Sequence, residues 1–305
     1  MSKKPLLICV VGATAIGKTT LSIALAKALD TEIISADSRQ FYSSMNIGTA
    51  VPSNQELAAA PHHFIQHKSI FDTYSVGDFE REALLKLDTL FSEKSTAILV
   101  GGSGLYVDAV VNGLDHFPDI EKEIREALNT QLDNNGLEIL QQELMSVDPL
   151  YFKSMDTENP RRVIRALEIY RATGKPYSSF LNVKSANRNF KTLYIGLSAE
   201  RPIVYERINK RVDIMLENGL LEEVKKLYPN RDLNALQTVA YRELFQYFDG
   251  TLSLEKAVEE IKKNTRRFAK RQGTWFRKNQ HIHWFDYTTN SEAIIEFIKE
   301  KNAQR

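Results

Sequence analysis

The sequence lacks several features that would mark an exported or membrane-bound protein. It has one cysteine, Cys9, in 305 residues, which excludes an intramolecular disulfide and a cysteine-based zinc site and suits a reducing compartment. No apolar run approaches the roughly 20 residues of a membrane span. The run at residues 6–11 is also shorter than the apolar region of a secretory signal, which needs about 7–15 residues. We therefore expect a soluble cytoplasmic protein with no membrane partner.

An excess of charge of either sign is also absent. The 40 basic and 39 acidic residues leave a formal charge of +1, so any basic surface for an anionic partner must be local. Hydrophobic residues make up 43% of the chain, which is enough to build one large domain or two moderate ones and excludes a disordered protein.

Continuous apolar segments alternate with helical periodicity in the first hundred residues. Such segments are typical of strands buried on both faces of a parallel sheet, and they occupy residues 6–11, 32–36, 97–100 and, much later, 193–197. Helical periodicity separates the first three, at 19–29 and 78–91. The pattern predicts an α/β core with a mostly parallel sheet flanked by helices.

The long interval before the last strand has helical periodicity only. It predicts helices over 119–133, 137–146 and 161–173, so we interpret 113–188 as an all-helical insert in a core made of 1–112 and 189–305. Further helices are expected at 204–217, 220–227, 241–248 and 254–271.

The first strand leads into a phosphate-binding motif. The sequence Gly12-Ala13-Thr14-Ala15-Ile16-Gly17-Lys18-Thr19 matches G-x-x-x-x-G-K-[ST] between a strand and a helix. Backbone N–H groups and a helix N-terminus would bind phosphate oxygens there, Lys18 would add charge, and the Thr19 hydroxyl would ligate Mg²⁺.

The third strand lacks the aspartate with which nucleotide hydrolases of this class help to hold Mg²⁺. Residues 97–100 run instead into Gly101-Gly102-Ser103-Gly104. This favours a loop that binds a departing diphosphate over one that holds a triphosphate for hydrolysis. Two interpretations of the glycines remain open: they let the backbone approach a substrate closely, or they form a plain turn.

Asp37 follows the second strand directly, at the sheet edge where parallel α/β proteins bind ligands. It is interpreted as a general base or a Mg²⁺ anchor, with helix capping as the alternative.

Residues 261–285 contain no acidic side chain, and basic residues alternate there with aromatic ones. This composition favours nucleic-acid contact, with a basic helix packed on the core as the alternative. Arg161 and Arg165 share one helix face, which fits either a solvated surface or a binding surface. The histidines at 62, 63, 67, 281 and 283 lack the pattern of a zinc site, and none is expected.

Taken together, the segments GATAIGKT, ADSRQFY, MNIGTA, AAPHH, YSVGDF, LVGGSGLY, NPRRVIRALE, YERINKRVDIMLENGLLEEV and AKRQGTWFR resemble those of the bacterial tRNA dimethylallyltransferases, also called tRNA isopentenyltransferases. The resemblance runs in order from Ile8 to about Trp284. It implies transfer of the dimethylallyl group of dimethylallyl diphosphate to the exocyclic 6-amino group of the adenosine just 3′ of the anticodon, in tRNAs that read codons beginning with U. It also implies Mg²⁺ as the cofactor and the tRNA anticodon stem-loop as the partner. We expect a monomer without an obligate protein partner.

The resemblance also assigns roles to individual residues. The phosphate loop, Gly12 to Thr19, would hold the diphosphate, with Thr19 placing the metal; Asp37 would accept the proton of the amine; and Arg211 would support the leaving diphosphate. Ser103 would lie beside the reacting amine. The remaining positions are implied to touch tRNA, and they are Ser38, Arg39, Gln40, Arg125, Arg161, Arg162, Val163, Ile164, Arg165, Gln237, Thr238, Val239, Ala240, Tyr241, Arg242, Lys270, Arg271, Gln272, Gly273, Thr274, Trp275, Phe276 and Arg277.

Two positions depart from the family pattern. Ser103 replaces a threonine, which keeps the hydroxyl, and Ala240 replaces a glycine. A second copy with a shifted RNA preference would fit such changes. Two alternative functions also remain open: an adenylate isopentenyltransferase, which uses a free nucleotide, and a phosphate-loop kinase.

Overall fold

One six-stranded parallel sheet forms the centre of the α/β core. The computed structural model describes residues 4–181 and 187–303. Its strands are β1 (Leu6–Gly12), β2 (Ile33–Ser35), β3 (His62–His63), β4 (Thr96–Gly101), β5 (Lys191–Ser198) and β6 (Ile282–Asp286), in the order β3-β2-β4-β1-β5-β6. Every pair is parallel, so all carboxyl ends meet at one edge.

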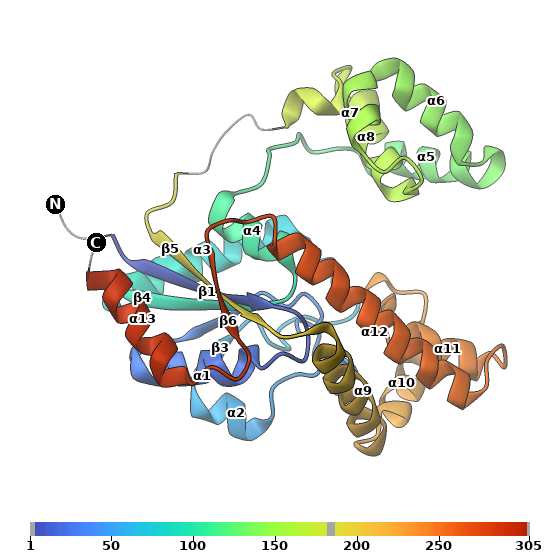
Figure 1. Ribbon diagram of the computed structural model, residues 1–305. Coiled ribbons are helices and arrows are strands. Elements are labelled where there is room, and N and C mark those ends of the chain that lie inside the picture. The colour runs from blue at the N-terminus through green and yellow to red at the C-terminus, as the bar shows by residue number, and fades with distance from the viewer. Residues whose placement is uncertain (1–3, 182–186, 304–305) are drawn as a thin grey trace. The chain divides into compact units, whose positions relative to one another are not determined.

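Helices cover both faces of this sheet (Figure 1). Every residue of β1 is buried because alternate side chains enter two separate hydrophobic cores. Leu6, Ile8 and Val10 pack with α1 (Lys18–Ala28) and α13 (Ser291–Ala303). Leu7 and Cys9 belong to the larger core, which includes side chains of α3 (Val76–Glu93) and α4 (Gly104–Asn112). The predicted α/β class is confirmed.

The other helices of the core follow β5, apart from the short α2 (Asn54–Ala59). They are α9 (Arg201–Glu217), α10 (Leu220–Leu227), α11 (Tyr241–Phe248) and α12 (Leu254–Phe276), with 3-10 turns at Tyr228–Asn230 and Asn234–Leu236. None of the helices in the described ranges combines the length and the apolar character that a membrane crossing requires.

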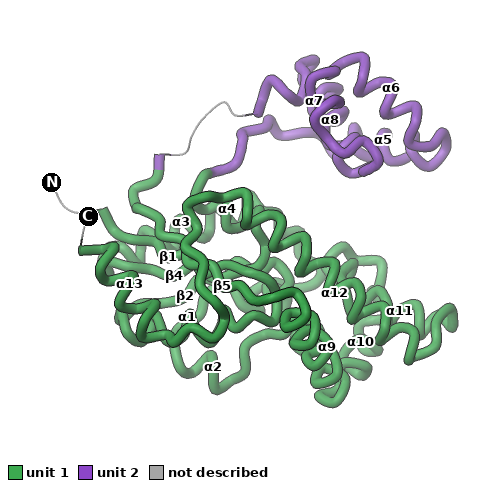
Figure 2. The backbone as a smooth tube through the Cα atoms, in the orientation of Figure 1, with its two compact units in different colours: residues 1–112, 188–305 green, residues 113–187 purple. Residues whose placement is uncertain are grey.

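The chain divides into two compact units, Met1–Asn112 with Arg188–Arg305 and Gly113–Asn187 (Figure 2). The second unit contains α5 (Lys122–Asn135), α6 (Leu137–Val147), α7 (Pro149–Ser154), α8 (Pro160–Thr173) and a 3-10 turn at Tyr177–Phe180. Asn159 caps α8 with Pro160 in the first turn, as its sequence predicts. The unit has its own core, formed by Leu128, Leu140, Leu144, Val163, Ile164 and Leu167 with Ala166.

Several elements were not expected from the sequence. The two edge strands were missed because β3 has only two residues and β6 buries only Ile282 fully, so neither has a continuous apolar run. Helix α4 was missed because it begins inside the glycine-rich stretch, and α2, α7 and α13 were also missed. Helix α12 extends to Phe276, beyond the predicted end at 271.

Ala240 has an unusual backbone conformation for a residue with a side chain. Its φ is +79° and its ψ is −45°, a region that favours glycine, and its N–H donates to Glu243 Oε2 at 2.8 Å. The chain therefore holds an alanine in a conformation that glycine adopts more easily.

We expect Ala240→Gly to increase the free energy of unfolding by about 1 kcal/mol, because it removes the steric cost of a positive φ. Urea denaturation measures this change. Ala235→Gly, at a buried position with negative φ two residues before Gln237, is the control and should destabilise the chain. Equal destabilisation by both substitutions would show that Ala240 carries no strain.

Candidate functional site

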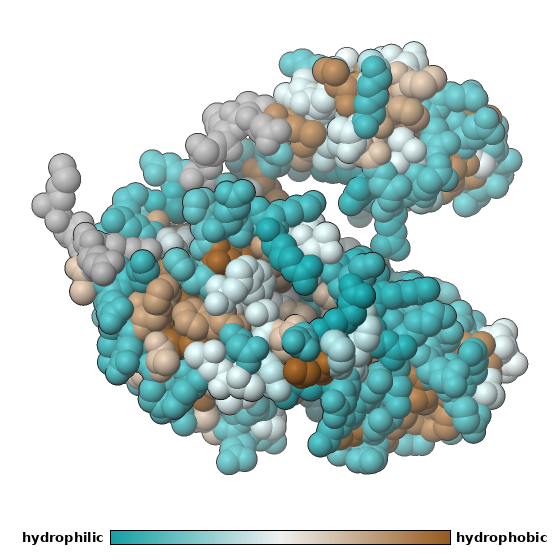
Figure 3. Space-filling view, in the orientation of Figure 1, coloured by the Kyte–Doolittle hydropathy of each residue, from teal (hydrophilic) through white to brown (hydrophobic). Residues whose placement is uncertain are grey.

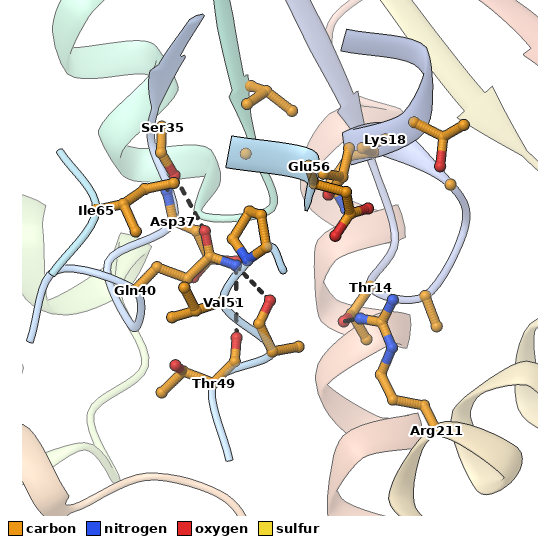
Figure 4. Close-up of a pocket in the computed structure, with 18 of the residues that line it drawn as sticks. Thr14, Lys18, Ser35, Asp37, Gln40, Thr49, Val51, Glu56, Ile65 and Arg211 are labelled. Carbon is orange, nitrogen blue, oxygen red and sulfur yellow. Dashed lines mark hydrogen bonds between the residues drawn. The ribbon is translucent and has the colours of Figure 1, made fainter. Parts of the chain in front are cut away.

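A cavity of about 760 Å³ lies at the carboxyl edge of the sheet. Its wall contains the phosphate loop, Asp37, Gln40 and two arginines of α9, Arg207 and Arg211. In Figure 4, Asp37 and Gln40 lie on one side, and Thr14, Lys18 and Arg211 lie on the other. The structure thus brings together side chains separated by up to 197 positions in the chain.

The phosphate loop has the backbone that its sequence predicts. Gly12, with a φ of +143°, cannot be replaced because an added Cβ would lie 2.5 Å from the Leu197 carbonyl oxygen. Gly17 also has a positive φ, and α1 begins directly after it at Lys18. Lys18 Nζ donates to the Ala13 carbonyl at 2.7 Å, and Thr19 lies in the same wall. The loop therefore presents a helix N-terminus, an ammonium group and a hydroxyl to the cavity.

Two arginines one helical turn apart face the phosphate loop. Arg207 Nε donates to the Ala15 carbonyl at 2.7 Å, and Arg211 Nη1 approaches Thr14 Oγ1 at 3.5 Å. Burial lowers the pKa of the Arg211 guanidinium, and the charge of Arg207 lowers it further. Sequence reasoning missed Arg207, although its i, i+4 spacing from Arg211 on a predicted helix was the available signal. Together with Lys18, these residues place three cationic side chains on a wall that also contains the carboxylates of Asp37 and Glu56.

Asp37 lies just beyond β2 and is fixed by a local turn. Its Oδ1 accepts the Arg39 N–H at 3.1 Å, and the next residue, Ser38, contacts Ser103 through a pair of hydroxyls 3.2 Å apart. The Ser38 N–H also donates to Ser103 Oγ at 3.3 Å. The carboxylate is therefore oriented by its own segment, and the next residue of that segment is held by the loop after β4.

A second cavity, of about 290 Å³, also has Asp37 in its wall. The two cavities share six wall residues, which are Thr14, Asp37, Thr49, Ala50, Arg211 and Met215. Arg39, Arg242 and Arg271 also line the second cavity. Asp37 can therefore be approached by one molecule from the phosphate loop and by another, anionic one from the arginine-rich side.

Helix α12 presents different residues to solvent and to the core. Lys270, Arg271, Thr274 and Arg277 are exposed, and Figure 3 shows hydrophilic side chains along this helix. Earlier in the helix, Lys262 pairs with Asp213 at 2.5 Å and Arg266 Nη1 donates to Asn209 at 2.8 Å, both on α9. The basic stretch thus packs on the core at its start and is free for an anionic partner only towards its end.

Gln272 and Phe276 were expected to touch tRNA, but their side chains are buried. Gln272 Oε1 accepts the Thr14 N–H at 2.8 Å, and its Nε2 donates to the Gly102 carbonyl at 3.0 Å. Gln272 therefore connects the phosphate loop to the loop after β4. The side chains of Val163 and Ile164, in the core of the second unit, and of Thr238, Ala240 and Tyr241 are buried as well.

The packing of α12 also explains the glycine-rich stretch after β4. A Cβ on Gly102 would lie 2.1 Å from Gln272 Nε2, and one on Gly104 would lie 2.3 Å from the indole of Trp275. Trp275 Nε1 donates to Asp108 Oδ2 at 2.8 Å on α4. These glycines allow α12 to pack closely against the loop after β4. This packing is enough to explain them, so the interpretation that they make room for a substrate is not required.

In the second unit, two of the predicted arginines meet a buried carboxylate. Glu168 is 2% exposed, pairs with Arg165 and lies 3.7 Å from Arg125 Nε. Arg165 also lies over the ring of Phe117. Arg161 and Arg162 are exposed at the start of α8. Arg165 is thus held in place, in contrast to a freely solvated side chain.

Comparison with known proteins identifies relatives over nearly the whole chain. The model of the family described as IPP transferase matches residues 40–279. The tRNA dimethylallyltransferase of Christiangramia forsetii is 59% identical over 97% of this chain and 98% of its own length, and that of Flavobacterium psychrophilum is 58% identical over 97% and 98%.

Solved structures agree with the sequence relatives. The tRNA isopentenylpyrophosphate transferase of Bacillus halodurans is 38% identical, with a TM-score of 0.72 over 99% of this chain and 96% of that one. A eukaryotic dimethylallyltransferase acting on tRNA is 27% identical, with a TM-score of 0.83 over 99% of this chain and 80% of that one. The chain therefore belongs to the IPP transferase family, together with the tRNA dimethylallyltransferases of these organisms.

Proposed function

We propose that this chain is a tRNA dimethylallyltransferase that moves the dimethylallyl group of dimethylallyl diphosphate to the 6-amino group of the adenosine 3′ of the anticodon. The observation that carries the proposal is the position of Asp37, which lies on the wall shared by the phosphate-loop cavity and the arginine-rich cavity. A diphosphate in the first cavity and a flipped base of an RNA in the second could both reach such a residue.

The diphosphate is assigned to the first cavity. Lys18, Arg207, Arg211 and the N-terminus of α1 would bind it and stabilise the negative charge that develops as the allylic C–O bond breaks. Apolar side chains of the same wall, Ile47, Val51, Ile65, Ile214 and Met215, suit the prenyl tail. Enclosure between these walls would keep water from the developing allylic cation.

Asp37 is assigned the role of general base. Its carboxylate would accept a proton from the 6-amino group as the nitrogen forms a bond to C1 of the dimethylallyl group, and the C–O electron pair would leave with the diphosphate. Ser103, hydrogen-bonded to Ser38, would lie beside that amine.

Mg²⁺ is proposed as the cofactor, in part because Thr19 places a hydroxyl on the wall next to Lys18. One protein hydroxyl fits an ion that keeps several waters and is bound largely through substrate phosphates. When bound, it would supply charge neutralisation on the diphosphate.

The tRNA anticodon arm is assigned to basic side chains at the surface. Those of the core are Lys270 and Arg271 on α12 and Arg277 directly after it, and those of the second unit are the exposed Arg161 and Arg162 and the partly exposed Arg165 on α8. They would contact the phosphates of the RNA, with Arg39 and Arg242 near the flipped base. The core of 1–112 and 189–305 would thus carry the chemistry, and the insert of 113–188 would hold the RNA. We also propose that the enzyme works in the cytoplasm as a monomer.

The direct test supplies labelled dimethylallyl diphosphate and Mg²⁺ with either unmodified tRNA or free AMP. Label in tRNA alone is the expected result. Label in AMP would instead establish an adenylate isopentenyltransferase, which the relatives do not favour. Transfer of phosphate from ATP to an acceptor, in a separate assay, would establish a kinase.

Asp37→Asn should lower the single-turnover rate of prenyl transfer by about 10²–10⁴-fold, because the base is lost while the volume is kept. Affinity for tRNA, measured by filter binding, should stay nearly unchanged. Asp88→Asn, at an exposed carboxylate on α3, is the control and should transfer at the normal rate. A normal rate in Asp37→Asn would remove this residue from the mechanism.

Proton uptake should accompany binding of dimethylallyl diphosphate. Burial lowers the pKa of the Lys18 ammonium to about 8, with Asp37 raising it and Arg211 lowering it. A bound diphosphate stabilises the charged form and so raises this pKa, which means that affinity should fall as the pH rises above about 8. Calorimetry at a pH above this value, in two buffers of different ionisation enthalpy, measures the uptake. Lys18→Arg should show no proton uptake, because arginine stays charged at this pH. Equal proton uptake in the wild type and in Lys18→Arg would contradict the assignment of the uptake to Lys18.

Replacing Lys270 and Arg271 together by glutamine should lower the salt slope of tRNA binding by up to about 2, because two phosphate contacts are lost. Binding measured over a range of salt concentrations gives the slope. Lys299→Gln, on the exposed side of α13, should leave the slope unchanged. An unchanged slope in the double variant would move the RNA surface elsewhere.

A further inference from the structure

Residues 46–50, here called the partition loop, separate the two cavities beside Asp37. Asn46, Ile47, Thr49 and Ala50 line the phosphate-loop cavity, and Gly48, Thr49 and Ala50 line the arginine-rich one. The position of this loop therefore sets the width of the passage in which the two substrates would meet.

The partition loop is held by one side chain of α10. Glu223 Oε2 accepts the N–H groups of Asn46 and Ile47 at 3.0 and 2.7 Å. Its Oε1 accepts the Gly48 N–H at 2.9 Å and the Tyr241 hydroxyl at 2.7 Å. Three consecutive backbone amides and a phenol thus fill the four acceptor sites of one carboxylate.

Tyr241 also fixes the loop through its shape. The ring is fully buried, and a Cβ on Gly48 would lie 2.6 Å from its Cε2 atom. Glycine is required at position 48 because only a backbone without a side chain can lie against the ring. Tyr241 belongs to the segment that the family resemblance assigns to tRNA, yet its partners here are Glu223 and the partition loop.

The loop in turn positions the segment that carries Asp37. Gln40 Nε2 donates to the Ala50 carbonyl at 2.9 Å and approaches the Thr49 carbonyl at 3.5 Å, as Figure 4 shows. Gln40 Oε1 accepts the Ser35 hydroxyl at 3.2 Å, and the Gln40 N–H donates to the Asp37 carbonyl at 2.9 Å. Glu223 thus holds the amides of residues 46–48, and Gln40 joins the carbonyls of the next two residues of the loop to the residues on both sides of Asp37.

We propose that Glu223 and Tyr241 form a latch that holds the partition loop and Gln40, and that they thereby position Asp37 between the prenyl donor and the target base. Neither side chain lines the phosphate-loop cavity, so neither is assigned a contact with the diphosphate. Both are positioning residues for the reaction proposed above, on which this inference rests. Their loss should lower the rate of the chemical step more than the affinity for either substrate.

Glu223→Gln tests the latch because it keeps the volume but places an amide NH₂ group where the carboxylate accepts hydrogen bonds. We expect the single-turnover rate, with both substrates saturating, to fall by about 10–100-fold, while the two dissociation constants change by less than about threefold. Glu222→Gln removes the same charge from the neighbouring, exposed position and should leave the rate unchanged.

Hydrogen exchange supplies a readout that does not depend on activity. In Glu223→Gln the amides of residues 46–48 should exchange at least about tenfold faster than in the wild type, because they lose their acceptor. Faster exchange with a normal transfer rate would overturn the positioning role, and so would unchanged exchange.

Tyr241→Phe keeps the ring against Gly48 and removes only the hydroxyl. It therefore tests the positioning role if Glu223→Gln fails to fold. Its rate should fall by about 3–10-fold, since one of four hydrogen bonds is lost. A normal rate there would overturn the latch. If the wild-type protein transfers no prenyl group, the proposed function is refuted. The exchange measurement would still test whether Glu223 and Tyr241 hold the partition loop.

Discussion

The close approach of backbone segments at the carboxyl edge of the sheet is the constraint on which the site depends. Gln272 joins two of these segments, because its side-chain amide accepts from the phosphate loop and donates to the loop after β4. Close approach also needs the absence of a side chain at two positions, at Gly102 against Gln272 and at Gly12, where the phosphate loop lies against Leu197. A buried amide with both its oxygen and its nitrogen bonded keeps the two loops at a fixed separation.

A second consequence of this packing is the concentration of positive charge. Lys18, Arg207 and Arg211 all face one short loop, and two of them donate to its carbonyl groups. Cations held close together and partly removed from water raise the free energy of the site, which a bound polyanion would lower. The lowered pKa values of Lys18 and Arg211 express the same strain.

Helix α12 contributes buried side chains to the core and basic side chains to the surface. Its inward residues Gln272 and Phe276 pack on the core, while Lys270, Arg271 and Arg277 point to solvent. Basic and buried positions alternate because the helix repeats every 3.6 residues, so a continuous stretch of motif sequence supplies two different surfaces. A match to the motif alone does not show which of its residues are buried and which are exposed. Glu223 and Tyr241 illustrate the same point, since both lie in family segments and both contact a distant loop.

The α/β class, the four apolar strands, the phosphate loop and the family were all predictable without a structure. These follow from local patterns: continuous apolar runs, a glycine-lysine motif between strand and helix, and long matching segments. The tertiary structure decided what depends on distant residues: the edge strands β3 and β6, the place of Arg207 beside the phosphate loop, and the burial of Gln272, Val163 and Ile164. It also decided why glycine stands at 48, 102 and 104, because the side chain that excludes a Cβ at each of these positions comes from more than 160 residues away in the chain.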